Sequence, residues 1–268
     1  MQRFVQVLIQ GCIVLVILLQ FPVISNSETV LPKLKENELY ISFLNIPDGE
    51  ATLLQTPKGE NFLINTGSEN SRSDLWKQLK QLNVNQLDGV ILTKQTRDYC
   101  GNIEQVLEQY HVKNIYVGDA KRSFKQQVDS NISQNTWYTD DHTQLTEGLN
   151  IHVLQTNELG EMSFTIEYGK NKILYMSISE LEHDQLIEDK RVKAEIIKIA
   201  DYGQGQSPST TLLETMDPHI SIVFHQKSGK PNKALLERLK ESWIDVYQLE
   251  QVGTTIIRLT LNDYEVIS

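Results

Sequence analysis

Residues 39–67 read LYISFLNIPDGEATLLQTPKGENFLINTG, and this stretch decides the fold. It contains three short runs rich in β-forming residues, at 39–46, 51–55 and 61–65. Pro57-Lys58-Gly59 lies between the second and third runs, and Pro and Gly favour a tight turn there. The stretch therefore predicts an antiparallel hairpin preceded by a strand, at the start of a folded domain.

Downstream of this hairpin, helical and strand patterns alternate. Leu75, Leu79 and Leu82 recur at helical spacing, and residues 89–93 (GVILT) form a continuous apolar run typical of a strand buried on both faces. The expected elements of this first half are helices at 71–82, 103–110 and 120–128, and strands at 89–93 and 114–117.

The second half repeats this order and also opens with a hairpin, which turns at Gly169-Lys170-Asn171. The expected strands are 151–155, 163–168, 172–176, 195–199, 220–224, 244–248, 254–261 and 264–267, and the expected helices are 179–188, 209–215 and 232–241. Two sheets that pack together need outer helices to cover their other faces. We predict an α/β (α+β) fold with four layers in the order αββα, formed by residues 39–268.

The N-terminus predicts a targeting element. Residues 4–24 contain no charged side chain, and a helix of this length spans a hydrocarbon core of about 30 Å. A cleaved signal peptide has the same composition. We expect residues 1–25 to be a signal peptide or a membrane anchor and residues 26–38 to be a linker. The protein would then be extracytoplasmic, either anchored to the membrane through residues 4–24 or secreted to the bacterial cell surface.

Charge and cysteine content exclude several classes of protein. The chain of 268 residues has 25 Lys and Arg against 35 Asp and Glu, a net charge of −10. Bulk binding of nucleic acid is not expected, because a phosphate backbone requires a positive face. Cys12 lies in the apolar segment, so Cys100 is the one thiol outside it. A disulfide framework and a cysteine zinc cluster are therefore excluded.

The blocks around the opening hairpin resemble a known family. These blocks are 41–51 (ISFLNIPDGEA), 56–59 (TPKG), 63–67 (LINTG) and 87–93 (LDGVILT). They are similar to the opening of metallo-β-lactamase-fold proteins, and in particular to the extracytoplasmic domain of the bacterial DNA-uptake competence channel and its stand-alone relatives. The resemblance covers residues 39–261. It implies the αββα fold, and in the family this fold carries a dinuclear zinc site.

The residues at the family's metal motifs differ in this sequence. After the strand at 89–93 the family has H-x-H-x-D-H, and an Asp follows L-T-G later in the chain. Asp98 retains the Asp of the first motif, and the H-H-G-S motif reads Asp201-Tyr202-Gly203-Gln204. The degenerate positions are Lys94, Thr96, Asp98, Tyr99, Ile178 and Asp201. A catalytic zinc needs at least three protein ligands, so the resemblance implies a metal site that has been lost.

A reduced metal site is the alternative. Asp98, Asp201 and His225 would supply two carboxylates and one imidazole for a single divalent metal such as zinc or manganese. Against this, Asp98 is expected to cap the helix that begins near Gly101, where free backbone N–H groups need an acceptor. We expect no cofactor and no catalytic residue.

Cations at the former metal cleft suggest a second kind of site. If the resemblance holds, Lys94, Arg97, Lys230 and Lys233 lie on loops around the cleft. Ammonium and guanidinium groups bind phosphate or carboxylate without hydrolysing it. The partner would be an anionic small molecule or a protein, although solvated surface lysines have the same sequence pattern.

Three functions are consistent with these observations. The first is a non-catalytic pseudoenzyme that binds an anionic ligand or a partner. The second is a metal-dependent hydrolase, similar to a phosphodiesterase or nuclease, with a reduced site. The third is an accessory protein of DNA uptake, which the net charge disfavours.

Overall fold

The computed structural model describes residues 31–119 and 131–267. The chain divides into two compact units, Met1–Pro32 and Lys33–Ser268, and the second unit contains the predicted domain. The segment at 4–24 and the helix expected at 120–128 lie outside the described residues. In the ranges that are described, no helix is both long and apolar enough to cross a membrane.

Among the described residues, one sheet has eight strands in the order β15-β14-β1-β2-β3-β4-β5-β6. Its pairs are antiparallel from β15 to β3 and parallel from β3 to β6. The strands are β1 (Leu39–Phe43), β2 (Thr52–Gln55), β3 (Asn61–Ile64), β4 (Gly89–Leu92), β5 (Asn114–Gly118), β6 (Ser133–Trp137), β14 (Thr255–Leu259) and β15 (Tyr264–Val266).

The other sheet in the described part of the chain has seven strands in the order β13-β12-β11-β10-β9-β8-β7. Strands β7 to β10 are antiparallel, and β10 to β13 are parallel. The strands are β7 (His142–Thr146), β8 (Leu149–Thr156), β9 (Met162–Tyr168), β10 (Asn171–Tyr175), β11 (Ile196–Lys198), β12 (Ile220–Val223) and β13 (Asp245–Gln248).

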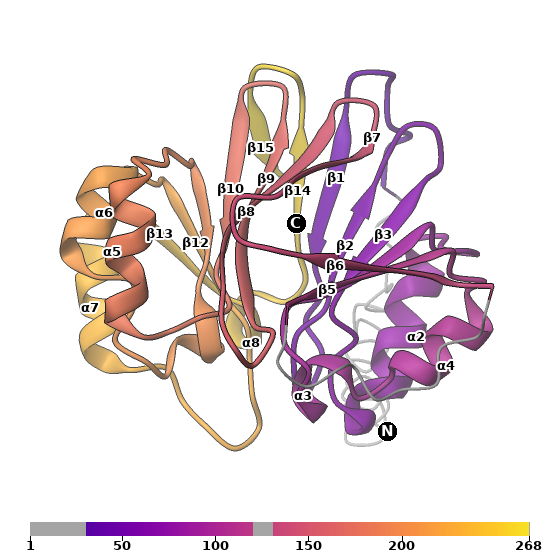
Figure 1. Cartoon of the computed structure of the whole chain (residues 1–268), viewed down its shortest axis with the longest axis horizontal. Helices are drawn as coiled ribbons and strands as arrows, with labels where there is room; N and C mark the ends of the chain where they lie inside the picture. Colours follow the sequence, from indigo (N-terminus) through magenta and orange to yellow (C-terminus); the bar gives the residue numbers. More distant parts are fainter. Residues whose placement is uncertain (1–30, 120–130, 268) are drawn as a thin grey trace, which may run out of the picture. The chain divides into compact units, whose positions relative to one another are not determined.

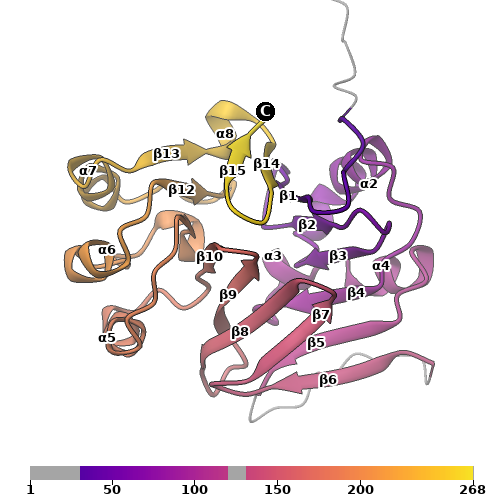
Figure 2. The same cartoon turned by 90° about the horizontal axis from the view of Figure 1, so that it is seen from above.

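Helices cover the outer face of each sheet (Figure 1). In Figure 2, α2 and α4 lie beside the eight-stranded sheet, and α5, α6 and α7 lie beside the seven-stranded sheet. The helices are α2 (Arg72–Gln81), α3 (Arg97–Cys100), α4 (Ile103–Gln109), α5 (Leu181–Asp189), α6 (Thr210–Met216), α7 (Lys233–Glu241) and α8 (Leu249–Val252), with 3₁₀ turns η1 (Glu69–Ser71) and η2 (Ala200–Gly203). The predicted four-layer αββα fold is confirmed.

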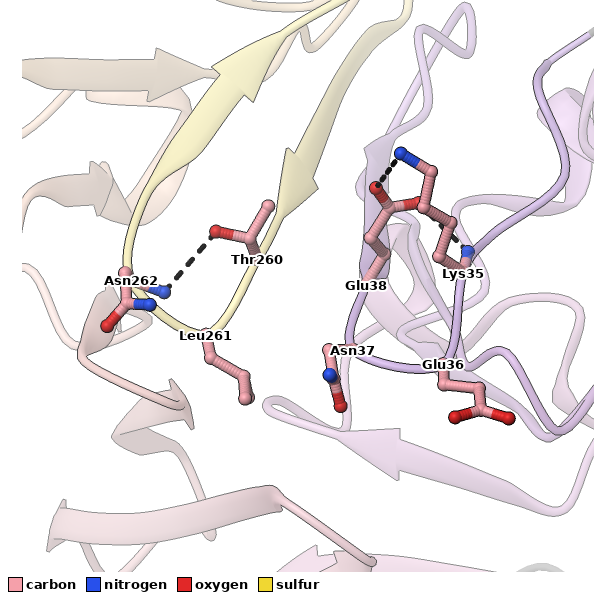
Figure 3. Close-up of a pocket in the computed structure, with 7 residues that line it drawn as sticks. All are labelled: Lys35, Glu36, Asn37, Glu38, Thr260, Leu261 and Asn262. Atoms are coloured by element: carbon pink, nitrogen blue, oxygen red, sulfur yellow. Dashed lines mark hydrogen bonds and ion pairs between the residues drawn. The ribbon is translucent and has the colours of Figure 1, made fainter.

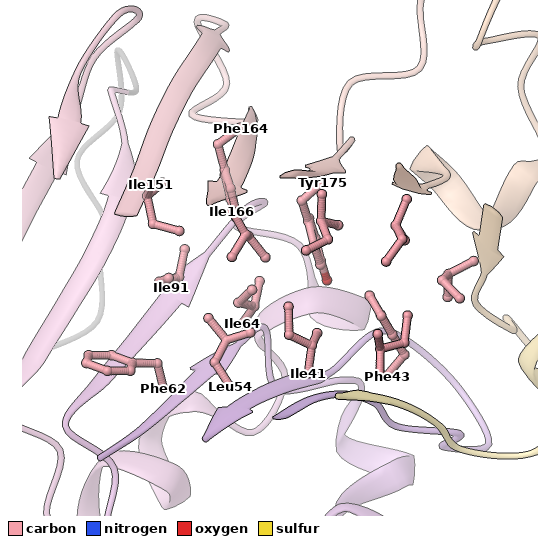
Figure 4. Close-up of a cluster of buried hydrophobic side chains, with 14 of the residues drawn as sticks. Ile41, Phe43, Leu54, Phe62, Ile64, Ile91, Ile151, Phe164, Ile166 and Tyr175 are labelled. Carbon is pink, nitrogen blue, oxygen red and sulfur yellow. The ribbon is translucent and has the colours of Figure 1, made fainter. Parts of the chain in front are cut away.

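Three apolar clusters of described residues follow from this layering. The central cluster lies between the sheets and takes side chains such as Ile41 and Phe43 from one sheet and Phe164 and Tyr175 from the other (Figure 4). The rings of Phe164 and Tyr175 stack with centroids 5.3 Å apart. Two further clusters lie between the outer helices and the sheets, one cluster for each sheet. Burial of apolar surface on both faces of each sheet explains the continuous apolar runs in the strands.

The sequence did not predict β6, β7 or α8. β6 (SQNTW) and β7 (HTQLT) are polar strands that end the two sheets, and most of their side chains are exposed or half-buried. Because such strands gain little from burial, backbone pairing with β5 and β8 determines their conformation rather than an apolar pattern.

The β7–β8 pair contains a pH-sensitive contact. His142 lies opposite His152, and their rings stack with centroids 3.9 Å apart. Burial and then the charge of His142 lower the pKa of His152, while Glu167 and Asp140 oppose the shift and Lys190 adds to it. Because the folded state binds this proton more weakly than the unfolded chain, the contribution to stability is complete above the unfolded pKa of about 6.5.

We expect this contribution to be lost as the pH falls from about 6.5 through the lowered pKa of folded His152. Urea unfolding of the full chain at a series of pH values between about 7.5 and 5 measures the effect. The midpoint should fall more steeply in the wild type than in His152→Gln, which has no ionisable ring. Parallel curves for the two proteins would contradict this assignment.

Candidate functional site

Charged and polar side chains meet where the parallel strands of both sheets end. Lys94 follows β4, Ser179 follows β10, Lys198 ends β11, and Asp201 lies in η2 directly after it. Sites in open sheets form at the carboxyl ends of parallel strands, because the loops there converge. The structure therefore brings together residues that are about a hundred positions apart in the sequence.

Lys94 is held between two carboxylates. Its Nζ lies 2.5 Å from Asp201 Oδ1 and 3.0 Å from Glu161 Oε1. The Lys94 side chain is 7% exposed, so its charge is turned toward these partners and not toward solvent. Ser179 Oγ donates to the second oxygen of Asp201, and Tyr99 OH donates to Oδ1 over 3.3 Å.

A second ion pair is completely buried. Lys198 Nζ donates to Glu50 Oε1 over 2.5 Å and to the Met176 carbonyl oxygen over 3.0 Å, and neither charged side chain has exposed surface. The Tyr99 hydroxyl donates to the same Glu50 oxygen over 3.2 Å. The Lys198 ammonium also lies 4.8 Å from the centroid of the Tyr175 ring. The ring face therefore adds a favourable cation–π contact to the pair.

A third set of contacts lies next to these pairs. Tyr202 OH donates to Asp98 Oδ2 over 2.8 Å, and Gln226 Nε2 donates to the same oxygen over 3.4 Å. The expectation that Asp98 caps the next helix is wrong. Asn102 precedes α4 and makes no side-chain cap hydrogen bond, whereas Asp98 lies inside α3 and its side chain points to Tyr202.

The backbone at Asp201 and Tyr202 is strained. Their φ angles are 45° and 57°, and Gly203 follows with φ 70°. A left-handed conformation costs about 1–2 kcal/mol for a residue with a Cβ atom. Gly203 ends a turn that also takes in two non-glycine residues. This turn directs the Asp201 carboxylate to Lys94 and the Tyr202 hydroxyl to Asp98.

The carboxylate pKa is shifted in opposite directions in the two pairs: it is raised for Glu50 and lowered for Asp201. Burial raises the pKa of Glu50 and lowers that of Lys198, because each charged form loses its hydration. Burial would also raise the pKa of Asp201, but the charge and hydrogen bond of Lys94 outweigh it, and the pKa is lowered. Lys94 and Asp201 therefore form a charged pair.

As they stand, these residues do not fit a divalent metal ion. Two ammonium groups lie among the carboxylates, and an ammonium has no lone pair with which to ligate. Within residues 31–119 and 131–267, no group of three or more His, Cys, Asp or Glu side chains is placed to hold a metal. Of the three candidate ligands, Asp98 and Asp201 lie in the site, whereas His225 Nδ1 is 3.5 Å from Glu250 Oε2 in α8.

The other expected cations lie on the segments around this site. Arg97, Lys230 and Lys233 are all exposed, unlike Lys94. Arg97 is next to Asp98, and Lys230 is next to Gly229, which packs against Gln204. Thr96 Oγ1 donates to Asp98, and Ile178 is fully buried in the loop after β10. Lys94 already has two carboxylate partners, so the cations that reach solvent are those of Arg97, Lys230 and Lys233.

Four residues of this cluster were not identified from the sequence. They are Glu50, Glu161, Ser179 and Lys198. One signal was available: Lys198 is a single charged residue in the buried run IIKIA, and a lysine there needs a buried partner. Glu161 carries no such signal, because it lies in a polar loop and reaches Lys94 only through the tertiary fold.

Cys100 should be unreactive. Burial, together with the charge of Asp98, raises the pKa of its thiol to about 11. At pH 8 about one thiol in a thousand would be ionised, so we expect modification by a disulfide reagent to be ~100-fold slower than for free cysteine. Stopped-flow absorbance measures the rate in the native Cys12→Ser variant, in which Cys100 is the one remaining thiol. The unfolded chain, in which the thiol is exposed, is the control, and equal rates in the two states would contradict the prediction.

A separate pocket lies away from the ion pairs (Figure 3). It is lined by Lys35, Glu36, Asn37, Glu38, Thr260, Leu261 and Asn262, and its volume is about 480 Å³. The segment before β1 and the turn between β14 and β15 form its walls. Glu38 is occupied by the backbone N–H of Lys35. No residue of the ion-pair site contributes to this pocket.

The fold and the position of this site define a class of protein. Solved structures with the metallo-β-lactamase fold superpose on the chain, and the chain has this fold. The metallo-β-lactamase-fold protein YhfI from Bacillus subtilis matches with a TM-score of 0.59 and 12% identity, over 78% of this chain and 95% of that protein. Igni18, a metallo hydrolase from Ignicoccus hospitalis, matches with a TM-score of 0.54 and 9% identity, over 85% of this chain and 99% of that protein.

The sequence is similar to ComE operon protein 3 of Bacillus subtilis. The two are 22% identical over 279 residues, which cover 91% of this chain. The match spans 34% of that protein, about a third of its length. No family model matches the chain. The predicted resemblance to this fold and to a competence protein is therefore confirmed.

Proposed function

We propose that this chain is a non-catalytic metallo-β-lactamase-fold protein that acts outside the cytoplasm by binding an anionic ligand or a partner. The observation that carries the proposal is the pair of ammonium–carboxylate contacts, the partly buried contact of Lys94 with Asp201 and the fully buried contact of Lys198 with Glu50. They occupy the loop ends where this fold would need metal ligands. A hydrolytic zinc hydroxide requires at least three protein ligands and an open coordination position.

The loss of the family's ligands supports the same proposal. Lys94, Thr96, Tyr99 and Ile178 stand at motif positions where the resemblance implies ligands. The Asp98 carboxylate accepts hydrogen bonds from Tyr202 and Thr96, and Asp201 is bound by Lys94 and Ser179. His225 lies beside Glu250, so the alternative mononuclear site would lack its imidazole unless this contact opened.

Solvent-facing cations beside the site support an anionic ligand. Arg97 is next to Asp98 in α3, Lys230 is next to Gly229, and Lys233 begins α7. Guanidinium and ammonium groups bind carboxylates and phosphates by charge-assisted hydrogen bonds. The similarity to ComE operon protein 3 and the apolar segment 4–24 are consistent with a role at the cell surface.

The purified full chain tests the catalytic part of this proposal. We expect no hydrolysis of a chromogenic phosphodiester above the buffer rate, with or without added zinc or manganese, and no tightly bound metal by elemental analysis. Stoichiometric metal together with turnover that a chelator abolishes would overturn the proposal and favour the reduced-site hydrolase.

Inorganic phosphate and a single-stranded oligonucleotide test the binding part. Phosphate binding that is weakened in the double variant Arg97→Ser/Lys230→Ser supports the proposal, and Lys58→Ser, an exposed lysine paired with Glu147 on the surface, is the matched control. Equal binding by all three proteins would contradict it. Retention of the oligonucleotide that falls steeply with salt would favour a DNA-uptake accessory instead.

A further inference from the structure

The two ion pairs connect the first half of the chain, which forms β1 to β6, with the second half. In one pair the first half supplies the ammonium group, and in the other it supplies the carboxylate. Lys94 comes from the first half and its partners Asp201 and Glu161 come from the second. Glu50 comes from the first half and its partner Lys198 comes from the second. In each pair, an ammonium group of one half lies against a carboxylate of the other.

The carboxylates of this site outnumber its ammonium groups. Glu50, Asp98, Glu161 and Asp201 lie in the cluster that contains Lys94 and Lys198. An unpaired carboxylate in such an environment is costly, because burial removes the water that stabilises its charge. The second oxygen of Glu50 makes no hydrogen bond although it is fully buried, and it is in ionic contact with the Lys198 ammonium. The carboxylates therefore depend on the two lysines for positive charge.

We propose that the ammonium groups of Lys94 and Lys198 are built-in replacements for divalent cations, so that removal of the Lys94 ammonium turns its carboxylates into a divalent-cation site. This inference rests on the proposed function, since it explains how the fold holds this cluster without a metal. Truncation of Lys94 would leave Asp201, Glu161 and the hydroxyl of Ser179 around one vacated position.

The chemistry of that position specifies the class of ion. Its donors are carboxylate and hydroxyl oxygens, which suit hard cations such as Mn²⁺. The Asp201 side chain is 33% exposed, so an ion can reach it from solvent and complete its coordination with water. The position of Lys198 has no exposed surface, so Lys94 is the better residue to truncate.

Thermal unfolding of the full chain with and without 1 mM Mn²⁺ tests the proposal. We expect Mn²⁺ to raise the Tm of Lys94→Ala by about 3–6 °C, the effect of a ligand present at ten or more times its Kd on a domain of this size. Titration calorimetry should give one ion per chain. Mg²⁺ in place of Mn²⁺ should produce a smaller shift, because it demands stricter geometry and keeps its water.

Lys172→Ala is the matched control. It removes an ammonium from a surface ion pair, Lys172 Nζ to Glu167 Oε1 at 2.8 Å, where both side chains are solvated. We expect Mn²⁺ to shift neither this variant nor the wild type. A folded Lys94→Ala that Mn²⁺ does not stabilise would overturn the inference and leave the proposed function intact. Tight binding of one Mn²⁺ by the wild type would overturn the proposed function.

A second variant keeps the test decisive if Lys94→Ala does not fold in either buffer. In Lys94→Ser a hydroxyl stays near the carboxylates, and the short side chain leaves the position of the ammonium vacant. Stabilisation of Lys94→Ser by Mn²⁺ supports the inference, and a Tm that is independent of Mn²⁺ contradicts it.

Discussion

Lys198→Met should lower the free energy of unfolding by about 3–5 kcal/mol, the cost of leaving one member of a buried ion pair without its partner. Lys198 and Glu50 have no exposed surface, and their oxygen and nitrogen atoms are in direct contact. Methionine keeps the length and most of the volume of the lysine stem. The loss therefore reports the missing ammonium and not a cavity, and urea titration of the full chain measures it.

The double variant Lys198→Met/Glu50→Gln is the control for this prediction. Well-packed hydrophobic residues in place of both members of a buried ion pair are often neutral or stabilising, and this double variant likewise leaves no unpaired charge. The amide oxygen that Glu50→Gln introduces can still accept the hydrogen bond from Tyr99 OH. We expect the double variant to recover most of the stability lost in Lys198→Met. A double variant as unstable as the sum of the two single variants would show that the charges do not act as a pair.

Gly49→Ala should lower the free energy of unfolding by about 3–5 kcal/mol, through left-handed strain together with a steric clash. Gly49 has φ +98°, and a Cβ there would lie 2.2 Å from the Asp98 carbonyl oxygen and 2.7 Å from the Ser68 backbone nitrogen. Both neighbours are backbone atoms, so no side-chain rotation relieves the contact. The Glu50 backbone N–H donates to the same Asp98 oxygen. A shift of the Asp98 carbonyl away from the new Cβ would therefore also move Glu50, which belongs to the ion-pair site.

Gly59→Ala separates these two causes. Gly59 has φ +82° in the β2–β3 turn, and a Cβ there meets nothing within 4 Å. Its expected loss is about 1–2 kcal/mol, from backbone strain alone. Urea titration of both variants measures the difference, and equal losses would contradict a steric role for Gly49.

The fold was predictable from sequence because its determinants are local. The turn at Gly59 and the turn at Gly169 both adopt positive φ angles, and the strands predicted at 89–93 and 195–199 are buried strands in the structure. The polar edge strands β6 and β7 were not predicted, because they bury little and owe their conformation to a neighbouring strand.

The site was predictable only in part. Alignment with the family motif placed Lys94, Asp98 and Asp201 in one cleft, and the structure brings all three together in one cluster of contacts. Their partners could not be derived in this way, because Glu161 and Lys198 meet Lys94 and Glu50 only when both sheets have formed. The strain at Asp201 and Tyr202 also depends on tertiary contacts, since neither residue type favours φ above zero as glycine does.

The pairing of β14 with β1 has a consequence for how the chain denatures. β14 comes from the end of the second half, yet it completes the sheet of the first half. Neither half can unfold alone without breaking the backbone hydrogen bonds between β14 and β1. We therefore expect residues 33–268 to melt as one cooperative unit, with calorimetric and van't Hoff enthalpies that agree.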